Sequence, residues 1–179
     1  ILDVGCGRGE WIELLKTEGL QAKGVDINYV LITECKNRRL DVVQADFVPF
    51  LHQLSDATLG ALTAFHLIEH LSLKAFITLL DEALRVLRPG GCVILETPNP
   101  ENLIVGACNF YADPTHRNPL HSEMVKFVVE ARGFCHVTTQ YLHPVEAEDG
   151  LEDDGTETVK RLNALFYGPQ DYAVIGVKA

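Results

Sequence analysis

Three glycines at alternate positions, preceded by an aspartate, form the first stretch of this 179-residue chain that could do chemistry. The stretch reads Asp3-Val4-Gly5-Cys6-Gly7-Arg8-Gly9. Glycines in this arrangement let the backbone turn sharply and approach a ligand without a Cβ in the way. The apolar pattern of the following residues predicts a helix, whose first amide N–H groups and positive dipole end would face the same ligand. We therefore interpret the stretch as a ligand-binding loop; a turn that binds nothing is the alternative.

Two well-known phosphate-binding loops do not match this stretch. A Walker loop ends in Gly-Lys-Ser or Gly-Lys-Thr, which is missing here. A dinucleotide-binding loop has the spacing G-x-G-x-x-G, whereas the glycines here are Gly5, Gly7 and Gly9. The identity of the ligand therefore has to come from residues further along the chain.

Two more acidic residues stand at the predicted ends of apolar strands. Asp26 ends the strand 20–26, about 20 residues beyond the loop, where a nucleotide site places the carboxylate that binds ribose. A carboxylate can accept hydrogen bonds from both ribose hydroxyls, and Ile27 after it is predicted to line the same site. Asp46 ends the strand 40–46 and is followed by Phe47. Phe47 could equally belong to the core, and Asp26 could be a solvated strand end.

A histidine-rich segment follows the next predicted strand, 59–65. It reads His66-Leu67-Ile68-Glu69-His70, which matches the zinc peptidase pattern H-x-x-E-H. That pattern needs its ligands on one helical face. Here the segment follows a strand directly, next to a glycine loop, so a peptidase is disfavoured.

The order of these motifs resembles that of class I S-adenosylmethionine-dependent methyltransferases. The resemblance covers residues 3–178 and implies a role for each motif. Asp3 would lie near the methionine amine, and Gly5, Gly7 and Gly9 would cradle the methionine and ribose. Asp26 and Ile27 would bind the ribose, Asp46 and Phe47 the adenine, and His66 would line the methyl end.

Transfer to a hydroxyl group additionally requires removal of its proton, and histidine titrates near neutral pH. His70 and His116 are the candidate catalytic residues. We predict no metal site, with one open alternative. The segment also resembles that of small-RNA 2′-O-methyltransferases, in which Glu-x-x-Glu-His and a distant histidine hold a metal, although His66 replaces the first Glu. A mixed site of His66, Glu69, His70 and either His116 or His121 therefore stays possible.

The remaining pattern predicts the elements that hold these residues. Strands at 20–26, 40–46, 59–65 and 92–97 alternate with helices at 11–16, 29–39 and 73–87, which indicates a doubly wound parallel sheet. Ser72 is the expected N-cap of the third of these helices, and residues 88–91 are expected to form a turn after it. A helix at 122–132, with Met124, Phe127, Val128 and Ala131 on one face, precedes strands at 136–142 and 171–178, and we expect these two to be antiparallel. The predicted fold is α/β: a mostly parallel, seven-stranded Rossmann-like sheet with an antiparallel last strand and helices on both faces. Its ligand would lie at the carboxyl ends of the strands.

Length and composition are those of a single domain, residues 1–179. Residues 98–121 are predicted to be an ordered, lid-like insert, and the acidic stretch 146–157 a solvated loop. The chain begins inside a strand without methionine, so we expect that N-terminal residues are missing. A net charge of −10 argues against a double-stranded nucleic acid partner. Five cysteines without a C-x-x-C pair suggest a cytoplasmic protein, and no apolar run is long enough for a transmembrane segment.

Three further segments, 96–100, 110–121 and 165–176, resemble bacterial methyltransferases associated with glycosyltransferases of cell-surface polysaccharide synthesis. The resemblance implies a small-molecule or carbohydrate acceptor and an association with a glycosyltransferase. Two other functions stay open. One is a non-catalytic cofactor-binding module that supports a partner enzyme; the other is an NAD-dependent oxidoreductase on a similar fold.

Overall fold

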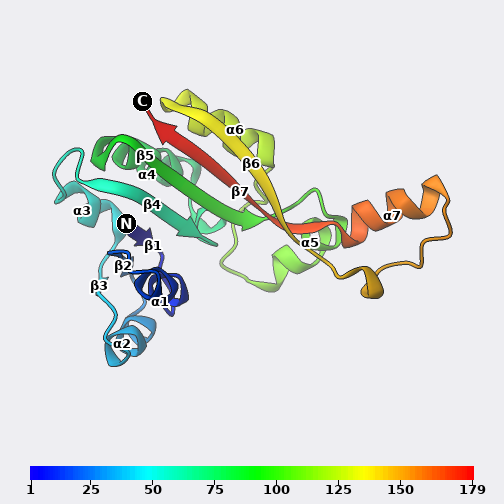
Figure 1. The fold of residues 1–179 in the computed structure, drawn as a ribbon, viewed down its shortest axis with the longest axis horizontal. Coiled ribbons are helices and arrows are strands. Elements are labelled where there is room, and N and C mark those ends of the chain that lie inside the picture. The colour runs from blue at the N-terminus through cyan, green and yellow to red at the C-terminus, as the bar shows by residue number, and fades with distance from the viewer.

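The computed structural model describes residues 1–179, apart from the side chain of Ala147. Its centre is a seven-stranded sheet with the order β3-β2-β1-β4-β5-β7-β6 (Figure 1). The strands are β1 (Leu2–Val4), β2 (Lys23–Asp26), β3 (Val42–Gln44), β4 (Leu59–Phe65), β5 (Leu87–Pro98), β6 (Phe134–Pro144) and β7 (Pro169–Lys178). The first five pair in parallel, and β7 is antiparallel to both neighbours, β5 and β6. The predicted fold class is confirmed.

Seven α-helices and three short 3₁₀ helices connect the strands in the described part of the chain. The α-helices are α1 (Glu10–Thr17), α2 (Tyr29–Asn37), α3 (Phe47–His52), α4 (Leu73–Val86), α5 (Leu103–Ala107), α6 (Ser122–Ala131) and α7 (Glu157–Tyr167). The 3₁₀ helices are η1 (Ile68–His70), η2 (Asn109–Ala112) and η3 (Ala147–Asp149).

Two apolar cores lie on opposite faces of the sheet. The larger one joins the strands to α3, α4 and α6, and the smaller one joins them to α1 and α2. Successive residues of β2 show the alternation: Val25 belongs to the larger core, whereas a Cβ on Gly24 would meet Ile12 of α1. Side chains on a strand point alternately to the two faces, so the two cores require helices on both faces.

Helix α4 shows how sequence pattern sets the larger core. The hydroxyl of Ser72 accepts a hydrogen bond from the Ala75 amide at 3.2 Å and caps the helix, as predicted. Phe76, Leu79, Leu80, Ala83 and Val86 are all buried, and they follow the helical spacing of one face.

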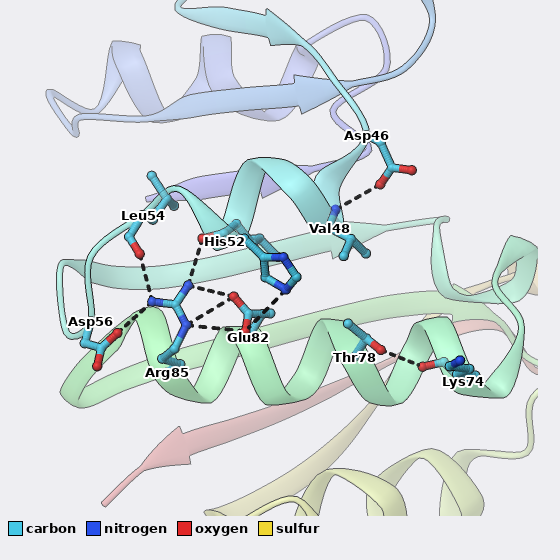
Figure 2. Close-up of polar contacts among 10 residues, drawn as sticks. Asp46, Val48, His52, Leu54, Asp56, Lys74, Thr78, Glu82 and Arg85 are labelled. Carbon is cyan, nitrogen blue, oxygen red and sulfur yellow. Dashed lines mark hydrogen bonds and ion pairs between the residues drawn. The ribbon is translucent and has the colours of Figure 1, made fainter.

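Helix α3 was not predicted: Phe47 was placed directly after a strand, and residues 48–52 were assigned to no element. The carboxylate of Asp46 caps it by accepting from the Val48 amide at 2.9 Å, and Phe47 is its first residue (Figure 2). Its other end is held by α4: the Arg85 guanidinium donates to the carbonyls of Leu51 and Leu54, both at 2.8 Å (Figure 2). The same guanidinium pairs with Asp56 at 2.7 Å and Glu82 at 2.6 Å. These long-range contacts stabilise a helix that is too short to form alone.

Two other predictions about elements were wrong. The turn expected at Arg88–Gly91 is a bulge within β5, because the strand already pairs at Leu87 and its register against β4 shifts before Cys92. On α6, the expected core residues Phe127 and Ala131 are exposed, and Val125 and Val129 are buried instead.

The second half of the chain extends the sheet to one side. Strands β6 and β7 form a long antiparallel ribbon, and α7 lies at its far end, near α5 (Figure 1). Residues 98–121, the predicted insert, contain α5 and η2, and the acidic stretch contains η3. Among the described residues, we find no helix with the length and apolar character needed to cross a membrane.

Candidate functional site

A pocket of about 190 Å³ lies at the carboxyl ends of β1, β2 and β3. Most of its lining is apolar, and two carboxylates stand at its edge. The lining residues are Gly5, Val25, Asp26, Ile27, Ala45, Asp46, Phe47, Leu67 and Leu71. The topology of an open α/β sheet places a ligand at this edge, as the sequence predicted.

The glycine loop closes one side of the pocket. Gly5, Gly7 and Gly9 have φ values of +73°, +51° and +78°, a region that favours glycine. A Cβ on Gly5 would lie 3.0 Å from Leu67, and one on Gly9 would lie 2.7 Å from Leu40, whereas the corresponding position at Gly7 is open. A side chain at Gly9 would therefore collide with its neighbours, and one at Gly5 would require Leu67 to shift; the backbone conformation favours glycine at both positions.

Asp26 connects the loop to the end of β2. Its Oδ2 accepts from the Gly7 amide at 2.9 Å, and its Oδ1 accepts from the Asn28 amide at 2.7 Å. A carboxylate has about four acceptor positions, so both oxygens can still accept hydrogen bonds from a ligand. Ile27, beside it, is 72% exposed and presents its side chain to the pocket.

Asp46 and Phe47 approach the pocket from the first turn of α3. The capping bond uses Oδ1 of Asp46 and leaves Oδ2 available. Arg85 binds the Leu51 carbonyl near the other end of α3. By fixing the helix, this hydrogen bond also fixes the position of Asp46 and Phe47.

Asp3 lies beneath the loop and does not line the pocket. It is only 3% exposed, and its Oδ1 accepts from the Thr63 hydroxyl at 2.7 Å. Burial raises the pKa of Asp3 to about 6, and the Asp26 carboxylate contributes in the same direction. The carboxylate therefore carries an unfavourable buried charge at neutral pH.

Five of the nine predicted cofactor residues line the pocket: Gly5, Asp26, Ile27, Asp46 and Phe47. Asp3, Gly7, Gly9 and His66 lie outside its lining. The other four lining residues were not predicted: Val25, Ala45, Leu67 and Leu71 are apolar and carry no signal of a binding role. Only their place at or just after the ends of β2, β3 and β4 could have indicated it.

His66 has a positive φ of +49° and faces carboxylates from three elements. Its Nδ1 lies 3.4 Å from Oε1 of Glu69, and its Nε2 lies 3.6 Å from Oε1 of Glu96 and 3.9 Å from Oδ1 of Asp171. These carboxylates, first Glu69 and then Glu96, raise the pKa of His66 to about 10. The ring is therefore charged at neutral pH in the ligand-free molecule and is unsuited to act as a general base.

His70 has a defined tautomer because of Thr115. The Thr115 hydroxyl donates its single proton to Oδ1 of Asp113 at 2.6 Å, and the same oxygen lies 2.9 Å from Nδ1 of His70. Thr115 can therefore only accept from His70, so the ring proton is on Nδ1 and the lone pair on Nε2. An unprotonated Nε2 can accept a proton.

His116 lies against His70, with ring centroids 4.7 Å apart. Its Nδ1 lies 2.6 Å from the Phe110 carbonyl, which can only accept, so its Nε2 also carries the lone pair. The two predicted catalytic histidines, from η1 and the insert 98–121, are thus brought together. Together with Glu69, they offer ligand atoms within 4.8 Å of one another, so this group could hold a metal. His66 and His121 are not part of it.

The sheet order, the glycine loop and the position of the pocket define a methyltransferase domain of the class I type. The model of the methyltransferase domain family matches residues 1–139. The chain belongs to the family of class I S-adenosylmethionine-dependent methyltransferases, whose cofactor is S-adenosylmethionine.

Three similar proteins illustrate the match. A solved structure of an S-adenosylmethionine-dependent methyltransferase from Archaeoglobus fulgidus is 35% identical, with a TM-score of 0.91 over 99% of this chain and 85% of that one. A protein of Mycolicibacterium smegmatis, named as a probable S-adenosylmethionine-dependent methyltransferase, is 28% identical over 75% of this chain and 51% of its own length. The chain thus spans about half the length of the curated relatives it matches first. The Haemonchus contortus phosphoethanolamine N-methyltransferase 2, solved with S-adenosyl-L-methionine, shares the fold at 17% identity and a TM-score of 0.75, over 99% of this chain and 48% of that one.

Proposed function

We propose that this domain transfers the methyl group of S-adenosylmethionine to a hydroxyl group of a small molecule or a sugar. One observation carries the proposal: Asp26, Asp46 and Phe47 converge on a single pocket beside the glycine loop. These side chains come from two strand ends and suit the ribose and the adenine of the cofactor.

Each cofactor residue has a proposed role, and for Gly5, Asp26, Ile27, Asp46 and Phe47 the contact with the pocket supports it. Asp26 binds the ribose hydroxyls with its free acceptor positions, and Ile27 covers the ring. Asp46 accepts from the adenine amino group, and Phe47 packs against the base. Gly5, Gly7 and Gly9 allow close approach of the cofactor, and Asp3 supplies negative charge near the methionine amine. His66 lines the methyl end.

The chemistry needs few further groups. When bound, S-adenosylmethionine supplies a methyl group that its sulfonium already activates. Positioning of the acceptor can then lower the barrier by roughly 7–11 kcal/mol in favourable cases. His70 accepts the proton of the acceptor hydroxyl at Nε2, which Thr115 keeps unprotonated, and His116 stands beside it.

We also propose a carbohydrate acceptor, a glycosyltransferase partner, a cytoplasmic location and a lid for this domain. A carbohydrate acceptor and an association with a glycosyltransferase are supported by the resemblance of segments 96–100, 110–121 and 165–176. A cytoplasmic location is supported by five cysteines without a disulfide in the described structure. Residues 98–121 act as a lid over the acceptor, which the contacts of Thr115 and His116 with His70 support.

Isothermal titration with S-adenosylmethionine, S-adenosylhomocysteine and NADH tests the cofactor. Wild type should bind the two sulfur compounds, and NADH should give no heat. Asp26→Ala should weaken binding at least tenfold, whereas Asp154→Ala, which removes an exposed carboxylate of the acidic stretch, should leave it unchanged. Binding of NADH alone would indicate the oxidoreductase. Cofactor binding without transfer to any hydroxyl acceptor in a screen of sugars would favour the non-catalytic module.

A further inference from the structure

Three carboxylates near the ends of β4, β5 and β7 have no lysine or arginine beside them in the described structure. Glu69, Glu96 and Asp171 have side chains that are 0%, 16% and 18% exposed. Within the described part of the chain, no lysine or arginine forms an ion pair with any of them; their partners are His66 and His143. Buried charges are costly unless they are paired or coordinate a metal, and the single imidazole of His66 faces all three carboxylates, so an excess of negative charge remains that a bound cation would offset.

The distances around His66 suit a shared metal better than hydrogen bonds. Its Nε2 lies 3.6 Å from Oε1 of Glu96 and 3.9 Å from Oδ1 of Asp171. N–H···O hydrogen bonds are typically about 2.7–3.2 Å long. Ligands at about 2.1 Å from one metal ion are roughly 3–4 Å from each other. The three ligand atoms all lie within 4.8 Å of one another, so small side-chain rotations would complete the arrangement.

We propose that His66, Glu96 and Asp171 form a binding site for a divalent transition metal ion. One nitrogen and two carboxylate oxygens suit Mn²⁺ or Zn²⁺. The remaining coordination positions would hold water or an oxygen of a bound molecule. In the ion-free molecule a proton on His66 offsets part of the negative charge, and the metal ion displaces it from Nε2.

Neighbouring groups orient two of these three ligands, as is usual around protein-bound metals. Oε1 of Glu69 is buried and has no hydrogen-bond partner within the described residues, and it lies 3.4 Å from Nδ1 of His66. It can therefore accept from the ring nitrogen opposite the metal. On the other side, Nδ1 of His143 lies 2.9 Å from Oδ2 of Asp171, the oxygen that faces away from His66.

The site is accessible from solvent. The His66 side chain is 49% exposed, and Glu96 and His143 line a cavity of about 350 Å³ together with Trp11 and Phe65. The site differs from the group of Glu69, His70 and His116, in which Glu69 would itself be a ligand. Since metal binding can be measured without S-adenosylmethionine, the inference does not depend on the proposed function.

Metal titrations of the EDTA-treated full chain test the site. Mn²⁺ binding is followed by electron paramagnetic resonance, and Zn²⁺ binding by calorimetry. Wild type should bind one ion. Glu96→Gln and Asp171→Asn, which keep side-chain shape, should each lower the affinity by at least about 100-fold, and His143→Ala by roughly 10- to 100-fold. Asp154→Asn and His116→Ala serve as controls and should bind as wild type does.

Thermal melts of each variant show whether it is folded, and the two isosteric variants provide independent tests if one of them unfolds. Two results would overturn the proposal. The first is that wild type binds neither ion at millimolar concentration. The second is that His116→Ala loses the ion while Glu96→Gln keeps it, which would place the metal at the other histidine group.

Discussion

The amide of Gly7 donates a hydrogen bond of 2.9 Å to Oδ2 of Asp26, and this bond ties the glycine loop to the end of the second strand. Asp26 thus shapes the site as well as offering acceptors to a ligand. In Asp26→Ala, we expect the amides of Gly7 and Asn28 to exchange with solvent faster than in wild type. Hydrogen exchange measured by NMR checks this, with Val25 in the core of β2 as an internal control.

The glycines of the loop should differ in their tolerance of alanine. At Gly7 a Cβ meets open space, so Gly7→Ala costs only the left-handed backbone, about 1–2 kcal/mol. At Gly9 a Cβ would also lie 2.7 Å from Leu40 and 3.0 Å from Cys35, which adds about 1–3 kcal/mol. Urea unfolding should therefore show Gly9→Ala to be the less stable variant. Equal stability of the two would contradict the packing around Gly9.

Asp3 should make the protein less stable as the pH rises. Its pKa of about 6 in the folded state lies above the value near 4 in an unfolded chain, so the native state binds the extra proton. The free energy of unfolding should fall between pH 4 and pH 6, by an amount on the order of 3 kcal/mol, and stay lowered above pH 6.

Asp3→Asn keeps an acceptor for Thr63 and should remove this dependence. The free energy of unfolding of the variant should equal that of wild type near pH 4 and exceed it at pH 7. Urea unfolding at both pH values measures this. A stability difference that is the same at the two pH values would show that Asp3 does not titrate in this range.

Arg85 should influence the pocket through α3. Arg85→Ala removes two hydrogen bonds to carbonyls and the arginine partner of both Glu82 and Asp56, so we expect a loss of about 2–3 kcal/mol of stability. S-adenosylmethionine binding should weaken as well, because Asp46 and Phe47 begin the same helix. Arg161→Ala is the matched control: its exposed ion pair with Glu157 contributes less than about 1 kcal/mol. If cofactor affinity is unchanged in Arg85→Ala, Arg85 does not position the pocket residues through α3.

Thr115 should set the tautomer of His70. In wild type, NMR correlations of the imidazole nitrogens should show the proton on Nδ1 of His70. Thr115→Val has a similar shape but no acceptor, so the Nδ1–H form should no longer dominate, whereas Thr115→Ser should retain it. A His70 spectrum identical in all three proteins would show that the hydroxyl does not act on the ring.

Local sequence patterns determined much of the fold. The alternation of apolar strands and helices predicted the parallel sheet, because such a pattern must bury helices on both faces. The Ser72 cap and the bounds of β4 were confirmed, since each depends on neighbouring residues. Asp26 and Asp46 were predicted to share a site, since parallel strands end at the same edge.

Tertiary structure decided the rest. Helix α3 forms because Arg85, more than thirty residues away, binds its carbonyls, and no local pattern shows that. The direction of α6 buries Val125 and leaves Phe127 exposed, because packing against β6 and β7 selects the face. His66 and His70 belong to one sequence motif, but the chain turns between them, so their side chains contact different partners. His66 faces Glu96 and Asp171 on neighbouring strands, and His70 faces Thr115 and His116 on the insert. Contacts between residues distant in sequence depend on strand order and register, which are properties of the whole sheet.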